Sequence, residues 1–158
     1  MKKVLIFALL ILITIGFIWG NSIKTVEQSS TQSTSIAELL RPILDPNYRL
    51  DKGEFHNLVR KLAHLAEFFV LGLFVVGFSL SLGTQLEKRF VSLPILMVLL
   101  VAVIDEYIQH FTGRGSLVTD VILDFAGAVT GIGVVALLRW AIQWIKYRIM
   151  YNRSIRRS

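Results

Sequence analysis

DEYIQHFTGRGSLVTDVILDFAG, residues 105–127, places acidic and basic side chains between two strongly apolar segments. Residues 91–104 are nearly all Leu, Val and Ile, and residues 121–138 are mostly Val, Ala, Leu, Ile and Gly. Segments of this length and composition are typical of membrane spans. An ionisable group at the end of a membrane span costs free energy unless it is paired, hydrated or takes part in function. Such a group is therefore a candidate functional residue. The stretch therefore predicts two membrane helices joined by a polar turn that belongs to a site.

The composition of the whole chain indicates a membrane protein. Of its 158 residues, 54% are hydrophobic and 18% are charged, and the mean hydropathy is +0.62, whereas soluble domains have about 25% charged residues. The absence of Cys excludes disulfides and thiolate chemistry. The net charge of +6 is more typical of membrane topology than of nucleic-acid binding in a chain this apolar. No nucleic-acid partner is expected.

The chain divides into four parts, which predict an all-α, polytopic membrane bundle of about four transmembrane helices. Residues 1–20 form an N-terminal anchor, which we expect to stay uncleaved because Phe17, Ile18 and Trp19 stand where a cleavage site needs small residues. Residues 21–60, rich in Ser, Thr and Gln, predict an extracytoplasmic loop with one helical turn at 36–40. Residues 61–145 supply three further spans, and residues 146–158 a basic cytoplasmic tail.

Four spans place both termini on the same side of the membrane. With the termini inside, ten of the seventeen Lys and Arg residues lie inside with one acid, Glu87, and the other seven lie outside with ten acids. The positive-inside rule counts basic residues near span ends and favours this orientation. We therefore expect a multi-pass protein of the bacterial cytoplasmic membrane with both termini cytoplasmic and with membrane lipids as partners.

This topology brings the polar ends of three spans to one depth at the outer leaflet. Within each helix the polar residues are three or four positions apart and so share a face. The candidate catalytic residues are His64, Glu67, Asp105 and Glu106, and the candidate ligand-binding residues are Lys61, Gln109, Arg114, Asp120 and Asp124. Gly127 and Gly131 continue the last of these faces and allow close approach of a neighbouring helix.

The predicted cavity combines carboxylates, one imidazole and fixed cations. This mixture suits general acid and base chemistry. It can also hold a divalent metal at His64, Glu67 and Asp105, although the spacing matches no specific metal motif and no cofactor is required. His110 and Arg60 are interpreted as ordinary interfacial residues.

The residues Lys61-x-x-His64-x-x-Glu67, Asp105-Glu106-x-x-Gln109, Gly113-Arg114, Asp120 and Gly127-x-x-x-Gly131 resemble the VanZ-like family. This family comprises small bacterial membrane proteins named for a teicoplanin-resistance accessory. The resemblance covers roughly residues 57–133, and the layout of one anchor, a polar outer segment and three spans is similar too. The chain departs from the family pattern at Leu65, where aromatic residues are common, and at Asp124, where an Asn is common. The resemblance implies a role at the cell envelope.

Three functional interpretations stay open on the sequence. The first is a VanZ-like protein whose outward-facing pocket binds a lipid-linked or peptidoglycan-related molecule and affects glycopeptide (teicoplanin) resistance. The second is a membrane hydrolase or transferase acting on a phosphorylated lipid carrier, with Glu67 or Glu106 as base, His64 as acid or metal ligand, and Arg114 on phosphate. The third is a structural bundle in which the polar cluster only holds helices together.

Overall fold

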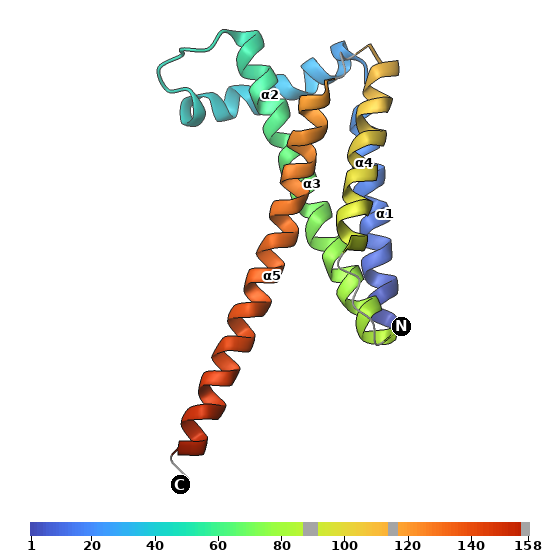
Figure 1. Cartoon of the computed structure of the whole chain (residues 1–158). Helices are drawn as coiled ribbons and strands as arrows, with labels where there is room; N and C mark the ends of the chain where they lie inside the picture. The colour runs from blue at the N-terminus through green and yellow to red at the C-terminus, as the bar shows by residue number, and fades with distance from the viewer. Residues whose placement is uncertain (87–91, 114–116, 156–158) are drawn as a thin grey trace.

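The structure is a computed structural model that describes residues 1–86, 92–113 and 117–155, with the backbone alone at 26–33, 35 and 153–155. All regular structure in these ranges is helical (Figure 1). The helices are α1 (Lys2–Ser22), α2 (Val26–Leu44), α3 (Lys52–Leu86), α4 (Ser92–Phe111) and α5 (Val118–Ile155). All but α2 are long and apolar enough to cross a membrane. The predicted all-α membrane bundle with about four spans is confirmed, and the chain is a multi-pass membrane protein.

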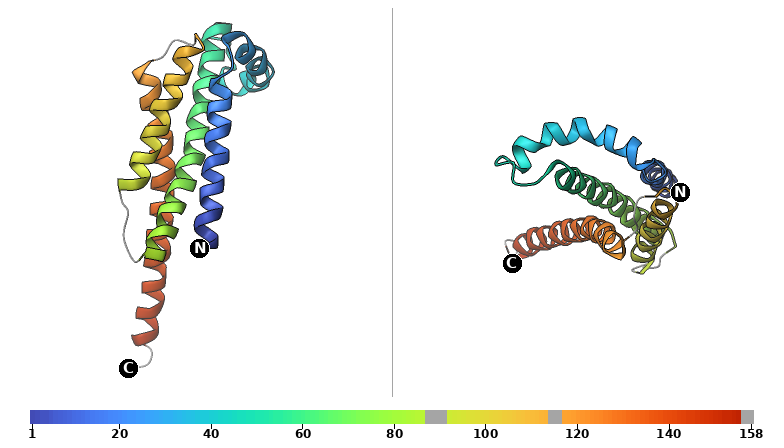
Figure 2. Two further views of the ribbon diagram at one scale, coloured as in Figure 1. Left: turned by 90° about the vertical axis from the view of Figure 1, so that its right-hand side faces the viewer. Right: turned by 90° about the horizontal axis from the view of Figure 1, so that it is seen from above.

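The four long helices run alternately up and down, and α2 lies across one end of the bundle (Figures 1 and 2). Helix α3 is the centre, since it packs against each of the other four. The start of α1 and the last described turn of α5 lie at the end of the bundle away from α2 (Figure 1). Residues 45–51, the end of α4 and the start of α5 are therefore at the same end as α2, as the four-span topology predicts.

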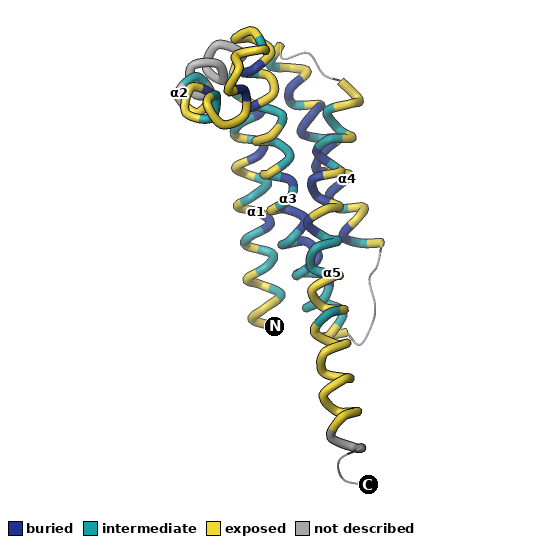
Figure 3. Tube along the Cα trace, turned by 90° about the vertical axis from the view of Figure 1, so that its left-hand side faces the viewer, coloured by how far each residue is buried: buried dark blue, intermediate teal, exposed yellow. Residues whose placement is uncertain are grey.

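The spans pack through one apolar cluster. It combines side chains of four helices, among them Ile18, Phe68, Leu71, Val98, Ala102 and Ala128. Burial is concentrated where the four helices overlap, whereas the C-terminal part of α5 extends beyond them and is exposed (Figure 3). The segment predicted as a tail from Lys146 continues this helix up to Ile155. A bilayer interior is about 30 Å thick and needs about 20 helical residues, which matches the length of α1 and α4.

Segment 21–60 is more ordered than the sequence interpretation expects. A helix covers Val26–Leu44, and α3 begins at Lys52. The apolar side chain of Ala37 on α2 packs against Phe55 and Val59 on α3, and this burial stabilises a helix whose composition alone is polar. The prediction of a loop with a single helical turn is corrected in this respect.

The start of α3 is stabilised by reciprocal capping. The Asp51 carboxylate accepts the N–H of Glu54 at 2.8 Å, and the Glu54 carboxylate accepts the N–H of Asp51 at 3.2 Å, which is a capping box. The preceding turn is held by Asp45, whose carboxylate accepts two backbone N–H groups, from Arg49 and Leu50. These contacts fix the first turns of α3, which lead to the polar residues at 60–67.

Glycines bring α3 and α5 unusually close together. A Cβ at Gly127 would meet the carbonyl oxygen of Leu65, and a Cβ at Gly131 would meet that of Phe69. From the opposite side, a Cβ at Gly72 of α3 would meet the backbone of Ala128. The prediction that the Gly127 and Gly131 pair allows close approach of a neighbouring helix is confirmed, and this contact brings residues 64 and 124 to the same depth.

Candidate functional site

The polar residues gather where the C-terminal ends of α1 and α4 meet the N-terminal halves of α3 and α5. Three of these helix ends follow from the predicted topology, and the fourth, α1, adds side chains that the sequence interpretation missed. The cluster comprises Asn21, Ser22, Lys61, His64, Glu67, Asp105, Glu106, Gln109, Asp120 and Asp124. Charged and polar side chains buried in a membrane bundle are functional candidates by default.

Asp105 is a fully buried member of the cluster. Its side chain is 0% exposed. The hydroxyl of Ser22 donates to Oδ1 at 2.6 Å, and the side-chain amide of Gln109 donates to Oδ2 at 2.8 Å. Both carboxylate oxygens are thereby fixed, one by α1 and one by the next turn of α4.

His64 lies between two buried carboxylates. Its Nδ1 is 3.7 Å from Oδ2 of Asp105 and 3.9 Å from Oδ1 of Asp124. Both distances are longer than a hydrogen bond, which ends near 3.2 Å for N–H···O. The side chain of Asp124 is 2% exposed. The imidazole therefore faces a carboxylate of α4 and a carboxylate of α5 across a narrow space.

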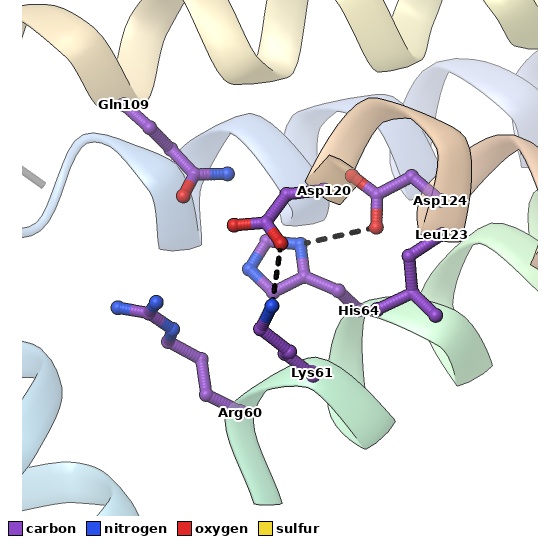
Figure 4. Close-up of a pocket in the computed structure, with 7 residues that line it drawn as sticks. All are labelled: Arg60, Lys61, His64, Gln109, Asp120, Leu123 and Asp124. Carbon is purple, nitrogen blue, oxygen red and sulfur yellow. Dashed lines mark hydrogen bonds and ion pairs between the residues drawn. The ribbon is translucent and has the colours of Figure 1, made fainter. Parts of the chain in front are cut away.

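A small pocket opens beside this group, and its lining side chains converge from α3, α4 and α5 (Figure 4). They are Arg60, Lys61, His64, Gln109, Asp120, Leu123 and Asp124. Lys61 and Asp120 form an ion pair of 2.8 Å, and their side chains are 35% and 16% exposed, against 12% for His64. The pocket thus runs inward from this ion pair to His64 and Asp124. Its volume of about 10 Å³ is enough for about one water molecule.

Two of the predicted catalytic carboxylates make other contacts and do not line the pocket. Glu67 accepts a hydrogen bond of 3.1 Å from the side-chain amide of Asn21, which ties α3 to α1. Glu106 accepts the backbone N–H of Leu117 at 2.6 Å, just before α5 begins. A carboxylate near a helix N-terminus is favourably placed for the helix dipole. The contacts of Glu67 and Glu106 therefore connect one helix to another.

The structure brings together most of the residues that the sequence nominates. Lys61, His64, Gln109, Asp120 and Asp124 line the pocket, and Asp105 lies next to His64. Arg114 lies outside the described residues.

The two residues interpreted as ordinary interfacial residues lie in different settings. Arg60 lines the pocket. His110 is exposed, and its ring contacts the ring of Phe111 edge to face, with 5.8 Å between the two ring centroids.

Sequence reasoning missed Asn21 and Ser22 as contributors to the cluster. The available signal was two consecutive polar residues at the end of the apolar anchor, directly after Trp19 and Gly20. Such residues are equally common in a simple exit from the membrane. Only the packing of α1 beside α3 and α4 distinguishes the two roles.

Comparison with known proteins supports the resemblance drawn from the motifs. A family model described as VanZ/LLP1 matches residues 5–139, which includes α1 through the first half of α5. No curated protein and no solved structure gives a significant match. The matched range covers far more than half of the chain and all of the polar cluster. The chain belongs to the VanZ/LLP1 family of membrane proteins.

Proposed function

We propose that this protein lies in the bacterial cytoplasmic membrane and binds the phosphate-bearing head group of a lipid-linked envelope molecule at the outer end of its pocket. Through this binding it affects susceptibility to glycopeptides such as teicoplanin. The observation that carries the proposal is the guanidinium of Arg60 beside the pocket, which forms no ion pair with any residue the structure describes. The family membership fits a membrane protein but does not specify the ligand.

Arg60 differs from its neighbour Lys61 in how its charge is balanced. Lys61 forms an ion pair with Asp120 at 2.8 Å. The guanidinium of Arg60 donates to the neutral side-chain oxygen of Asn57 at 3.1 Å and forms no ion pair with any residue the structure describes. A guanidinium presents a planar set of donors that matches phosphate oxygens in pairs. Arg60 is therefore the cation best placed to receive an anionic group.

The size of the pocket restricts which part of a ligand enters. A volume of about 10 Å³ has room for one water-sized group, so a lipid-linked molecule would place its phosphate at the entrance near Arg60 and Lys61. Its hydrocarbon chain would stay in the bilayer beside the helices, where apolar side chains are exposed on every span. This arrangement needs no large cavity within the bundle.

Binding of a short polyprenyl phosphate tests the proposal. We expect farnesyl phosphate to bind the purified protein in detergent, and farnesol, which lacks the phosphate, to bind at least tenfold more weakly. Arg60→Ala should weaken farnesyl phosphate binding by about tenfold or more, because a hydrogen bond to a charged group contributes about 1.5–3 kcal/mol. Isothermal titration with EDTA present measures both effects.

Lys52→Ala is the matched control, because Lys52 is an exposed cation in the first turn of the same helix and does not line the pocket. In cells, Arg60→Ala but not Lys52→Ala should change teicoplanin susceptibility. Equal binding by both variants, or equal binding of farnesol and farnesyl phosphate, would contradict the head-group proposal.

A second candidate function, hydrolysis or transfer at a phosphorylated lipid carrier, is favoured by the position of His64, whose Nδ1 lies 3.7 Å from Oδ2 of Asp105. General acids and bases often pair an imidazole with a neighbouring carboxylate, and Asp105 is itself held by Ser22 and Gln109. Release of inorganic phosphate from farnesyl phosphate, lost in His64→Gln, distinguishes this function from binding alone.

The orientation in the membrane gives a separate prediction. Because most basic residues of the sequence fall on the side of the membrane that the four-span topology assigns to the start of α1 and the far end of α5, we expect that side to be cytoplasmic. The chain has no Cys, so single cysteines report cleanly. In spheroplasts, Asn47→Cys, in the exposed turn before α3, should react with an impermeant maleimide, and Gln85→Cys, at the other end of α3, should react only after permeabilisation. The reverse pattern would place the pocket at the cytoplasmic face.

A further inference from the structure

We infer that His64, Asp105 and Asp124 bind one divalent transition-metal ion at the inner end of the pocket, with Zn²⁺ as the best-fitting ion. The sequence interpretation places a metal at His64, Glu67 and Asp105 instead. The inferred set exchanges Glu67, which contacts Asn21, for Asp124. The site lies deeper than the proposed head-group site and does not depend on it.

The three side chains lie close enough together to hold a metal ion. One ligand atom from each residue lies within 4.8 Å of the others. The nitrogen of His64 is 3.7 Å and 3.9 Å from the two carboxylate oxygens. In a tetrahedral zinc site with bonds of about 2.0–2.1 Å, neighbouring ligand atoms are roughly 3.3–3.5 Å apart. The two nitrogen–oxygen separations are too long for hydrogen bonds and need only small shifts to hold an ion. The carboxylate oxygens of Asp105 and Asp124, up to 4.8 Å apart, must move closer together.

Asp124 provides an independent argument for a ligand. Its side chain is 2% exposed and lines the pocket. Within the described residues, its single polar contact is the His64 nitrogen at 3.9 Å, so no described donor hydrogen-bonds this carboxylate. A buried charge without hydrogen-bond donors is strongly unfavourable. A divalent cation between Asp124 and His64 would compensate this charge.

The surroundings of the three side chains fit a metal ligand set. Ser22 and Gln109 donate hydrogen bonds to Asp105, and such outer contacts commonly orient metal-binding carboxylates. Each ligand residue comes from a different helix, α3, α4 or α5. The space of about 10 Å³ beside His64 and Asp124 accommodates one water-sized group, which corresponds to the open fourth position of zinc sites with three protein ligands.

The donor types select the class of ion. One imidazole nitrogen with two carboxylate oxygens suits Zn²⁺ and neighbouring transition metals, whereas Mg²⁺ prefers six oxygen ligands including several waters. We expect affinity to fall in the order Zn²⁺, Mn²⁺, Mg²⁺, following the general order for such ions. The alternative is an ion-pair group in which a protonated His64 bridges both carboxylates without metal.

Metal content and titration test the site in the full-length protein in detergent. After treatment with EDTA and its removal, we expect the wild type to bind about one Zn²⁺ per chain by isothermal titration and by elemental analysis. Asp124→Asn and His64→Gln should each lower Zn²⁺ affinity at least tenfold. Co²⁺ should give visible absorption bands in the wild type that are absent from both variants.

Glu67→Gln is the matched control, since it removes a carboxylate of the same cluster that contacts Asn21. It should bind Zn²⁺ like the wild type, whereas a loss equal to that of Asp124→Asn would favour the ligand set with Glu67. Melting curves without metal verify that each variant is folded. A wild type that binds no Zn²⁺, or a folded Asp124→Asn that binds it unchanged, would overturn the inference. Because the head-group titration is made with EDTA and this one without lipid phosphate, the two proposals fail separately.

Discussion

Replacing Gly131 with alanine is expected to destabilise the bundle by roughly 2 kcal/mol or more, the upper range for overpacking a tight contact. A Cβ at this position would meet the carbonyl oxygen of Phe69 and lie 3.2 Å from the backbone nitrogen of Leu73. These are backbone atoms of a neighbouring helix, so no side-chain rotation relieves the contact. Helices α3 and α5 must move apart, and this cost exceeds the gain of about 0.5–1 kcal/mol that alanine brings inside a helix.

Gly133→Ala is the matched control for this prediction. It makes the same chemical change in the same helix, but among the described residues no atom beyond its own stretch of helix backbone lies within 4 Å of its Cβ position. Thermal unfolding in detergent should therefore show a lower midpoint for Gly131→Ala and an equal or slightly higher midpoint for Gly133→Ala. Equal midpoints for the two variants would show that the close approach of α3 and α5 contributes little to stability.

The same substitution should also weaken the pocket. His64 directly precedes Leu65 on α3, and Asp124 lies about one turn before Gly127 on α5. Separating the helices therefore lengthens the distance between these two side chains. In Gly131→Ala, Zn²⁺ affinity should fall along with the melting point, whereas in Asp124→Asn affinity should fall alone. This difference separates a packing defect from the loss of a ligand.

The fold was predictable from the sequence because span length and hydrophobicity are local properties. Each apolar run is long enough to cross a bilayer, and the alternation of four spans fixes which helix ends meet. Only one turn of helix α2, at 36–40, was predicted, because the stability of the helix comes from contacts of Ala37 with Phe55 and Val59 on another helix. The early start of α3 did have a local signal, the Asp51 and Glu54 capping box, which the polar composition of the region obscured.

The sequence predicted the depth of the site in the membrane, but not which side chains contact one another. Helical spacing places Lys61, His64 and Glu67 on one broad face, yet it does not determine which side chain meets which neighbour. Glu67 turns to Asn21, whereas His64 meets Asp105 and Asp124. These pairings depend on the rotation of each helix about its own axis, and on α1, whose hydrophilic end has no distinctive pattern. The contacts between these side chains are therefore set by tertiary packing and not by local sequence.

Removing the Asp105 carboxylate should have the largest effect on stability of any change within the polar cluster. Asp105→Ala takes away the acceptor of Ser22 and Gln109 and the carboxylate beside His64, all in a fully buried setting. Breaking a buried charged pair typically costs about 3–5 kcal/mol, although single polar contacts in membrane bundles average about 0.6 kcal/mol. We expect a loss of roughly 3 kcal/mol in the unfolding free energy in detergent.

A double-mutant cycle with Ser22 tests whether this loss arises from the observed contacts. Ser22→Ala alone should cost about 1 kcal/mol, the usual net value of a hydrogen bond. In the Asp105→Ala background the same change should cost nothing, because the acceptor has already gone. Additive losses in the double variant would mean that the 2.6 Å contact between Ser22 and Asp105 contributes no stability.

Asp105→Asn then separates a structural cluster from a functional one. The amide keeps an oxygen that can accept from Ser22 and nearly the same volume, so most of the stability lost in Asp105→Ala should return. It does not keep the negative charge that a metal ion or a protonated His64 requires.

If the cluster only holds helices together, Asp105→Asn should keep both its melting point and the wild-type teicoplanin susceptibility. If the cluster is a site, the variant should melt near the wild type yet lose Zn²⁺ binding and the cellular phenotype. A variant that stays folded and retains both would leave the structural interpretation standing.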